Sequence, residues 1–341
     1  MNIQKYSLLD LLIQPGFFVK DNIITAVNAQ AKALLLEPGT EIHGLLATGK
    51  TELAGFQEGC LSLELLLGDQ KLPAAVTAAQ DGLLFILEPE TPELRSLALA
   101  ARELREPLAG LMACAQQLSA LPDGKEPASR LNRGLHQLLR IVGNMSDAGR
   151  KDSRMELREL CALTREIFDR AKSLTDHTGI TLTYEGPEEE IYGLADGNLL
   201  ERAVLNLLSN AIRFTPDGGT VQAKLTRHDR MLHLTVADSG SGIADAVRST
   251  LFRRYLRQPG LEDSRWGIGL GMVLVRSAAA SHGGTVLVTQ PGEGTRVTLT
   301  LAIRQDTENV VRSPLLRVDY AGELDHGLIE LSDCLPPELY E

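Results

Sequence analysis

The chain has 341 residues, enough for two or three domains that each bury a core of their own. Its net charge of −11 argues against a nucleic-acid partner, because binding phosphates requires a basic surface. We expect a cytoplasmic protein without a membrane span, because no signal peptide is recognisable and no stretch reaches about 18 apolar residues. The cysteines lack metal-ligand or redox spacing, which indicates reduced thiols: Cys60, Cys114, Cys161 and Cys334.

Residues 1–90 alternate short extended runs with turns. The runs are "GFFVKDNIITAVN", "LSLELLLGDQKLPAAVTAA" and "DGLLFILEPE", and a helix-like segment, "AQAKALLL", follows the first of them. This order of elements predicts a small α+β domain over residues 1–90.

From residue 94 onwards the apolar spacing becomes helical. Steps of three and four residues continue without a break through Leu94, Leu97, Ala101, Leu104, Leu108, Leu111, Ala115 and Leu118. After the turn "LPDGKEP" the pattern returns at Leu131, Leu135, Leu138, Val142 and Met145. The sequence therefore predicts an antiparallel pair of long helices over residues 91–152. A single pair of helices buries such apolar seams poorly, so we expect a homodimer that forms a four-helix bundle.

Residues 153–304 have the pattern of an α/β domain. Helices are expected at about 157–174, at 198–214 and at 271–282, and strands at 179–186, 190–196, 219–227, 231–238 and in a final hairpin, 283–303. We expect a mixed sheet with helices on one face. The remaining tail, 305–341, is acidic, and the sequence assigns it no role.

Four short motifs of this domain carry polar or glycine residues suited to a ligand. They contribute Asn206, Asn210 and Arg213 from "NLLSNAIRFT", Asp238, Gly240 and Gly242 from "DSGSGI", Gly267, Gly269 and Gly271 from "GIGLGMVLV", and Thr295 from "GEGT". The two asparagines lie four apart on one helix face. Glycines running into a helix start favour phosphate binding. Each motif alone is weak evidence, because glycine clusters usually mark turns.

In this order and spacing the four motifs resemble the nucleotide-binding domain of sensor histidine kinases. The resemblance implies a GHKL-type α/β sandwich that binds ATP and Mg²⁺. It places Asn210 on the Mg²⁺ ion, Asn206 and Arg213 near the phosphates, and Asp238 on the adenine amino group. Gly240 and Gly242 would shape the pocket beside the adenine. The residues Gly267, Gly269, Gly271 and Thr295 would complete the nucleotide site, and "LFRRYLR" at 251–257 resembles the lid of these kinases.

Position 206 separates kinases from simple ATPases within this superfamily. The related ATPases place a glutamate there to activate water, whereas this chain has Asn206. An amide cannot act as a general base, so we do not expect simple ATP hydrolysis.

The stretch "ARELREPL", residues 101–108, resembles the phosphoacceptor motif of histidine kinases, which reads Ser-His-Glu-Leu-Arg-Thr-Pro-Leu. Glu103 and Pro107 are retained, but Arg102 replaces the acceptor histidine. A guanidinium has no lone pair to offer a phosphoryl group. Glu106 replaces the Thr or Asn that orients water in relatives with phosphatase activity. We therefore expect no autophosphorylation at the usual site.

The heptad pattern places Arg102 and Glu106 on the outward face of the first helix, four residues apart. They can form an exposed ion pair of a few tenths of a kcal/mol. The interpretation we favour is a solvated helix face. The other hypothesis is that Arg102 contacts the acidic surface of a response-regulator receiver without passing on phosphate.

Residues 16–36, "GFFVKDNIITAVNAQAKALLL", resemble the start of a PAS sensor module, with Asn28 and Ala31 in its "N-x-x-A" places. No haem or flavin is implied, because His43 stands alone and Cys60 has no flavin-adduct context. A PAS fold used only for dimerisation or signal relay is at least as compatible with these residues as a ligand sensor.

Together these features favour a degenerate kinase that binds Mg·ATP and signals by conformation or scaffolding, with a response regulator or an intact histidine kinase as partner. The alternative is an active kinase that phosphorylates a partner chain or an unusual acceptor such as His136, the only histidine within the two long helices. A third reading is an interaction module that has lost ATP binding.

Overall fold

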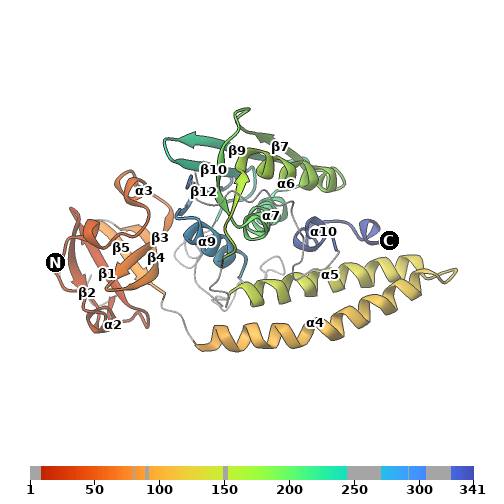
Figure 1. Cartoon of the computed structure of the whole chain (residues 1–341), viewed down its shortest axis with the longest axis horizontal. Coiled ribbons are helices and arrows are strands. Elements are labelled where there is room, and N and C mark those ends of the chain that lie inside the picture. The colour runs from red at the N-terminus through yellow and green to blue at the C-terminus, as the bar shows by residue number, and fades with distance from the viewer. Residues whose placement is uncertain are drawn as a thin grey trace.

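A computed structural model describes residues 9–79, 81–88, 92–148, 153–243, 270–290, 292–304 and 324–341. An N-terminal β-rich unit is followed by two long helices, a second α/β unit above those helices, and a short C-terminal segment (Figure 1). No helix in the described ranges has the length and apolar content needed to cross a bilayer.

The N-terminal unit is a five-stranded antiparallel sheet with short helices, and the sequence had predicted its mixture of strands and helix but neither the strand number nor the pairing. Its strands run in the order β2-β1-β5-β4-β3. Phe17 and Phe85 stack in its core with ring centroids 4.9 Å apart, and both are fully buried. Its elements are β1 (Gly16–Lys20), β2 (Ile23–Val27), α2 (Ala29–Ala33), η1 (Ile42–Leu45), α3 (Lys50–Ala54), β3 (Cys60–Leu67), β4 (Gln70–Ala79) and β5 (Gly82–Leu87).

The two long helices, α4 (Pro92–Ser119) and α5 (Lys125–Ala148), form the predicted hairpin, and Pro107 lies inside α4. Only part of the heptad seam is buried within the hairpin. Ala101, Leu108 and Ala115 of α4 pack against Leu135, Leu139 and Val142 of α5. The alternate heptad positions remain exposed, at Leu104 and Leu111 of α4 and at Leu131 and Leu138 of α5.

The second α/β unit contains the mixed sheet that the sequence predicted, because β7 pairs parallel with β9 while the other pairs are antiparallel. Buried residues of α6, α7 and α9 share one core with this sheet. The elements are β6 (Glu156–Glu159), α6 (Leu160–Thr175), β7 (Thr181–Glu185), β8 (Tyr192–Ala195), α7 (Gly197–Phe214), β9 (Thr220–His228), β10 (Met231–Asp238), α9 (Gly271–Ser281), β11 (Val286–Thr289) and β12 (Arg296–Ala302).

The start of α6 differs from the sequence prediction. Residues 157–159, expected to open the helix, belong instead to strand β6, which pairs with β8 in a separate two-stranded sheet. The helix therefore begins at Leu160. Its N-terminus is capped by the Glu159 carboxylate, which accepts from the N–H groups of Cys161 and Ala162.

The two β-rich units share one continuous sheet. Edge strand β3 of the N-terminal unit pairs antiparallel with β11, with Leu61 opposite Leu287, so that ten strands run together. A buried ion pair reinforces this junction, with the Arg276 guanidinium on α9 2.7 Å from the Glu88 carboxylate just after β5. Backbone pairing and this ion pair together tie the N-terminal unit to α9.

The C-terminal segment contains α10 (His326–Glu330) and η2 (Pro337–Tyr340). It contacts α5, α6 and α7 and fills the space between the hairpin and the second α/β unit (Figure 1). Ile329, Leu331 and Leu335 are fully buried there. The described end of the tail that the sequence left unassigned, residues 324–341, is thus a packed part of the fold.

Candidate nucleotide-binding site

Asp238 ends strand β10 and joins two of the predicted motifs. Its Oδ1 accepts hydrogen bonds from the backbone N–H of Gly240 at 2.9 Å and of Thr295 at 3.1 Å. Gly294 makes this approach possible, because its φ is +82° and a Cβ there would lie 1.9 Å from the Asp238 carbonyl oxygen. Oδ1 is held by the backbone, and among the described residues no hydrogen bond is made to Oδ2, which can therefore accept from a donor group of a ligand.

Burial raises the pKa of the Asp238 carboxyl above its ordinary value, and the two backbone N–H donors offset only part of that rise. The ionised carboxylate therefore costs the folded state free energy. A donor that bonds to Oδ2 of Asp238, such as an exocyclic amine, would offset part of this free-energy cost.

Helix α7 positions the predicted phosphate-side residues. Asp196 caps its N-terminus by accepting from the Leu199 N–H at 3.1 Å. Asn206 is fully buried, and Asn210 lies one turn further along the same face, half-buried. The start of α9 approaches this face so closely that a Cβ at Gly271 would lie 2.8 Å from the Asn206 Oδ1. A glycine at that position brings the free N–H groups of the α9 N-terminus next to α7.

The predicted phosphate-side donors are already engaged by the protein itself. Nδ2 of Asn206 donates to the Arg202 carbonyl oxygen at 2.9 Å and to Oε2 of Glu330 at 3.0 Å. Arg213 pairs with Asp333. Both carboxylates belong to the C-terminal segment, which sequence reasoning did not connect with this site.

The structure brings only part of the predicted set together. Gly240 and Thr295 both donate to Asp238, and Asn206 lies against Gly271. Gly267 and Gly269, and the lid stretch 251–257, lie outside the described residues.

Gln290 is a neighbour that the motifs did not indicate. Its Oε1 accepts from the Ile243 N–H at 3.3 Å, and its side chain would meet a Cβ at Gly242 at 2.2 Å. The Gln290 side chain therefore packs against the "DSGSGI" turn. Gln290 follows β11, and the sequence alone did not show that this residue and the turn are neighbours.

These residues fit a magnesium nucleotide. Asp238 offers an acceptor at one end, and the α9 N-terminus, Asn210 and Arg213 lie at the other. An amide oxygen such as that of Asn210 is a suitable ligand for Mg²⁺, which also takes oxygens from phosphates. Bound Mg²⁺ would neutralise phosphate charge at that end. Within the described residues no three His, Cys, Asp or Glu side chains gather into a metal site made by protein alone.

Arg102 and Glu106 lie on the exposed face of α4, where the heptad pattern placed them. They form no ion pair with each other in the described structure. Helix α5 lies between α4 and the second α/β unit (Figure 1). His136 on α5 is buried, its Nδ1 lies 2.8 Å from the Asn132 carbonyl oxygen, and its ring packs edge-on against Tyr340. Burial lowers the pKa of His136.

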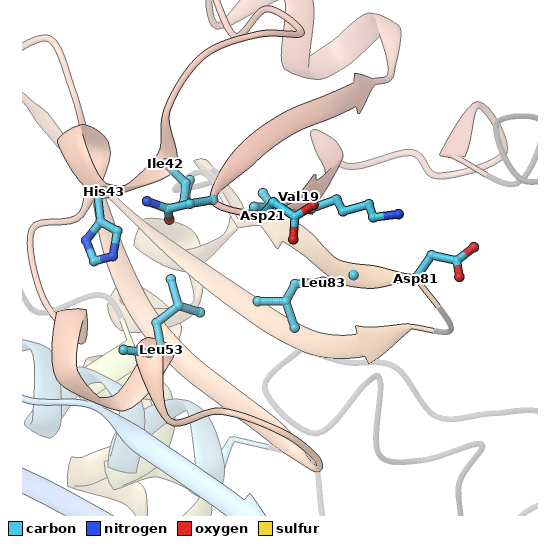
Figure 2. Close-up of a pocket in the computed structure, with 11 residues that line it drawn as sticks. Val19, Asp21, Ile42, His43, Leu53, Asp81 and Leu83 are labelled. Atoms are coloured by element: carbon cyan, nitrogen blue, oxygen red, sulfur yellow. The ribbon is translucent and has the colours of Figure 1, made fainter.

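A hollow of about 480 Å³ opens on the N-terminal unit, far from these residues in the fold. Figure 2 shows Leu53 and Leu83 on its apolar side and Asp21, Asp81 and His43 around it. The mixed lining brings no set of like polar groups to one point, and the core beside it is filled by the stacked phenylalanines. The hollow therefore indicates no particular ligand.

Known proteins share the second α/β unit. Residues 195–305 match the family model described as histidine kinase-, DNA gyrase B- and HSP90-like ATPase. The chain is 33% identical over 221 residues to histidine protein kinase DivJ of Caulobacter vibrioides, covering 61% of this chain and 37% of that relative. It is 31% identical over 211 residues to sensor histidine kinase CusS of Escherichia coli K12, covering 59% of this chain and 44% of that relative. The chain belongs to the histidine kinase family.

The chain spans less than half the length of both of these histidine kinases. A longer alignment, with hybrid signal transduction histidine kinase D of Dictyostelium discoideum, covers 79% of this chain at 30% identity and 19% of that relative. Among solved structures, full-length ShkA in complex with AMPPNP matches 64% of this chain and 47% of that chain, with a TM-score of 0.51 and 24% identity. That likeness shows a common fold.

Proposed function

We propose that this histidine kinase relative binds Mg·ATP but does not phosphorylate itself at the usual helix position, and that it signals through its conformation. The observation that carries nucleotide binding is Asp238, whose Oδ1 is fixed by Gly240 and Thr295 while no described residue bonds to its Oδ2. Asn210 would hold Mg²⁺, and Asn206 and Arg213 would meet the phosphates. The family match over residues 195–305 supports this assignment.

Loss of the acceptor rests on the sequence of α4. Arg102 occupies the place of the phosphoacceptor histidine and is exposed, as an acceptor would have to be. A guanidinium has no lone pair with which to attack phosphorus. Glu106, one turn on, carries a negative charge that repels a phosphoryl group. Because the residues at positions 102 and 106 are both changed, α4 keeps Glu103 and Pro107 of the motif but lacks the side chains that would take part in the phosphoryl chemistry.

The competing function is phosphoryl transfer to a different acceptor, either on an intact histidine kinase or at His136. The buried ring of His136, packed against Tyr340, argues against His136 while the C-terminal segment is in place. Transfer to a partner chain needs only a working nucleotide site, so the two functions differ in whether any chain becomes labelled.

A titration of the full chain with Mg·ATP tests the first part of the proposal. We expect saturable binding in the micromolar to millimolar range, weakened by EDTA because Asn210 then lacks its ion. Adenosine, which has no phosphates, should bind with no dependence on EDTA. Absence of binding to any nucleotide would leave the interaction-module interpretation.

We also propose that the chain forms a homodimer through its hairpin. Leu104, Leu111, Leu131 and Leu138 are 43–51% exposed and recur every seven residues on their helices. A second hairpin would bury them in a four-helix bundle, and each leucine contributes about 1.5–3 kcal/mol when fully buried.

Charged residues at two of these positions should separate the protomers. Sedimentation is expected to give a dimer for the wild-type chain and a monomer for Leu104→Glu/Leu111→Glu. The control is Gln116→Glu, at an exposed polar position of α4, and it should stay dimeric. A wild-type monomer at tens of micromolar, or a dimer that survives the double substitution, would contradict the bundle.

The N-terminal unit would be a PAS-like sensor that acts on the nucleotide unit through the β3–β11 pairing and the Glu88–Arg276 ion pair.

A response regulator is the partner we propose for the hairpin, where the exposed Arg102 could contact an acidic receiver. Equal affinity of the receiver for the wild-type chain and for Arg102→Glu would exclude that role for Arg102.

A further inference from the structure

The C-terminal segment, residues 324–341, occupies the space between α5 and α7 as a ligand would. Its apolar side chains Ile329, Leu331 and Leu335 are fully buried. Polar contacts hold it to α5, where Asn132 Nδ2 donates to the Tyr340 carbonyl oxygen at 3.0 Å and Arg133 Nε to that of Ser332 at 3.1 Å. Figure 1 shows α10 above α5 and beside α7. The segment is therefore bound specifically and does not merely cover a surface.

Glu330 is the centre of its polar contacts. The residue is fully buried, with Oε1 accepting from Arg202 Nε at 2.9 Å and Oε2 from Asn206 Nδ2 at 3.0 Å. Oε2 also lies 3.4 Å from Nε of Arg140 on α5. A buried carboxylate is tolerable only with such partners, so this site is built to hold a negative charge.

Asp333 supplies the second negative charge. Its Oδ2 pairs with both Arg140 and Arg213. The two carboxylates of the segment therefore meet three guanidinium groups, of which Arg202 has a further partner in Asp147. Departure of the segment would take both carboxylates away from these guanidinium groups, of which Arg202 and Arg213 lie on α7 and Arg140 lies on α5.

Asn206 shows why this arrangement excludes another anion. Its two amide hydrogens are used by the Arg202 carbonyl and by Glu330, and its Oδ1 accepts from Arg140 Nη2 at 3.3 Å. A phosphate oxygen therefore finds no free donor on Asn206 while Glu330 is in place. The same holds for the Arg213 nitrogen that pairs with Asp333.

We propose that the C-terminal segment is an internal competitor of the nucleotide phosphates, in which Glu330 and Asp333 take the donors that the triphosphate needs. This inference rests on the proposed function, because it assumes that Asn206 and Arg213 meet ATP phosphates. Binding of ATP then requires the segment to leave. Its release frees the face of α5 that it covers, including His136.

If the segment competes only with the phosphates, ligands with and without phosphates should respond to it differently. Mg·ATP binding should be weakened by the segment, whereas adenosine binding, which depends on the Asp238 end, should not. By reciprocity, Mg·ATP should loosen the segment and adenosine should not.

The test compares the full wild-type chain with Glu330→Gln/Asp333→Asn, which removes both charges and keeps the shapes. The matched control is Glu338→Gln/Glu341→Gln, two exposed carboxylates of the same segment. We expect Mg·ATP to bind about tenfold more tightly to the first variant, adenosine to bind equally to all three chains, and the control to match wild type. Equal Mg·ATP affinities in all three folded chains would overturn the proposal.

Hydrogen exchange of the unmodified chain gives a second test that does not depend on whether the variant folds. Backbone amides of residues 324–341 should exchange faster with saturating Mg·ATP and be unchanged with adenosine. Nucleotide binding without faster exchange would refute the competition and leave the proposed function standing. Absence of binding to every nucleotide, in the variant as well as in wild type, would refute both.

Discussion

An Asp238→Asn variant is expected to bind Mg·ATP at least about tenfold more weakly than the wild-type chain, in line with about 1.5–3 kcal/mol for a hydrogen bond to a charged group. An asparagine Oδ1 can still accept from the N–H groups of Gly240 and Thr295, so the loop geometry is kept. The other atom becomes an NH₂ group, which would face the adenine amine donor to donor. Calorimetric titration of both chains measures the difference.

The same variant should be as stable as wild type, or slightly more stable. Because burial raises the pKa of Asp238, its carboxyl favours the fold at low pH, and this contribution is lost as the pH rises through the raised value. A neutral amide avoids that loss at neutral pH. The control is Asp217→Asn at an exposed turn position. Weakened binding in the control, or a large fall in melting temperature for Asp238→Asn, would show that the effect is one of folding.

The sequence predicted features that depend on local periodicity. Heptad spacing located the hairpin of α4 and α5 and placed Arg102 and Glu106 on its outer face. Alternating apolar residues and turn glycines located the strands around Asp238. The resemblance assigned Asp238, Gly240 and Thr295 to one nucleotide site, but it did not predict the pairing of β10 with β12 or the hydrogen bonds that join these residues.

Features that depend on pairing between distant segments could not be predicted. Any edge strand offers free backbone N–H and C=O groups, so nothing in residues 60–67 marks β11 as the partner of β3. An acidic tail is usually solvated, and the burial of Glu330 depends on Arg140 and Arg202, which are remote in sequence. The orientation of Asn206 toward this tail likewise had no local signal. The start of α6 was misplaced because Glu156–Glu159 pairs with β8.

Restoring a histidine at position 102 should restore an acceptor. In an Arg102→His/Glu106→Thr variant, an imidazole nitrogen with a lone pair can form a bond to the γ-phosphorus as the bond to ADP breaks. We expect label from γ-labelled Mg·ATP to rise at least about tenfold above wild type, which corresponds to about 1.4 kcal/mol in barrier height. The matched control is Arg102→Gln/Glu106→Thr, which removes the same charges and supplies an amide that cannot accept phosphate.

The most direct measurement is therefore phosphate incorporation by the wild-type chain beside these two variants. All three chains also carry Glu330→Gln/Asp333→Asn, so that inhibition by the C-terminal segment is not mistaken for a nucleotide site that does not work. The account predicts label that is lost in acid and kept in base in the Arg102→His/Glu106→Thr chain, and none in the wild type or the glutamine control. Label on the wild-type chain would contradict it, and mapping of the labelled residue would then begin with His136.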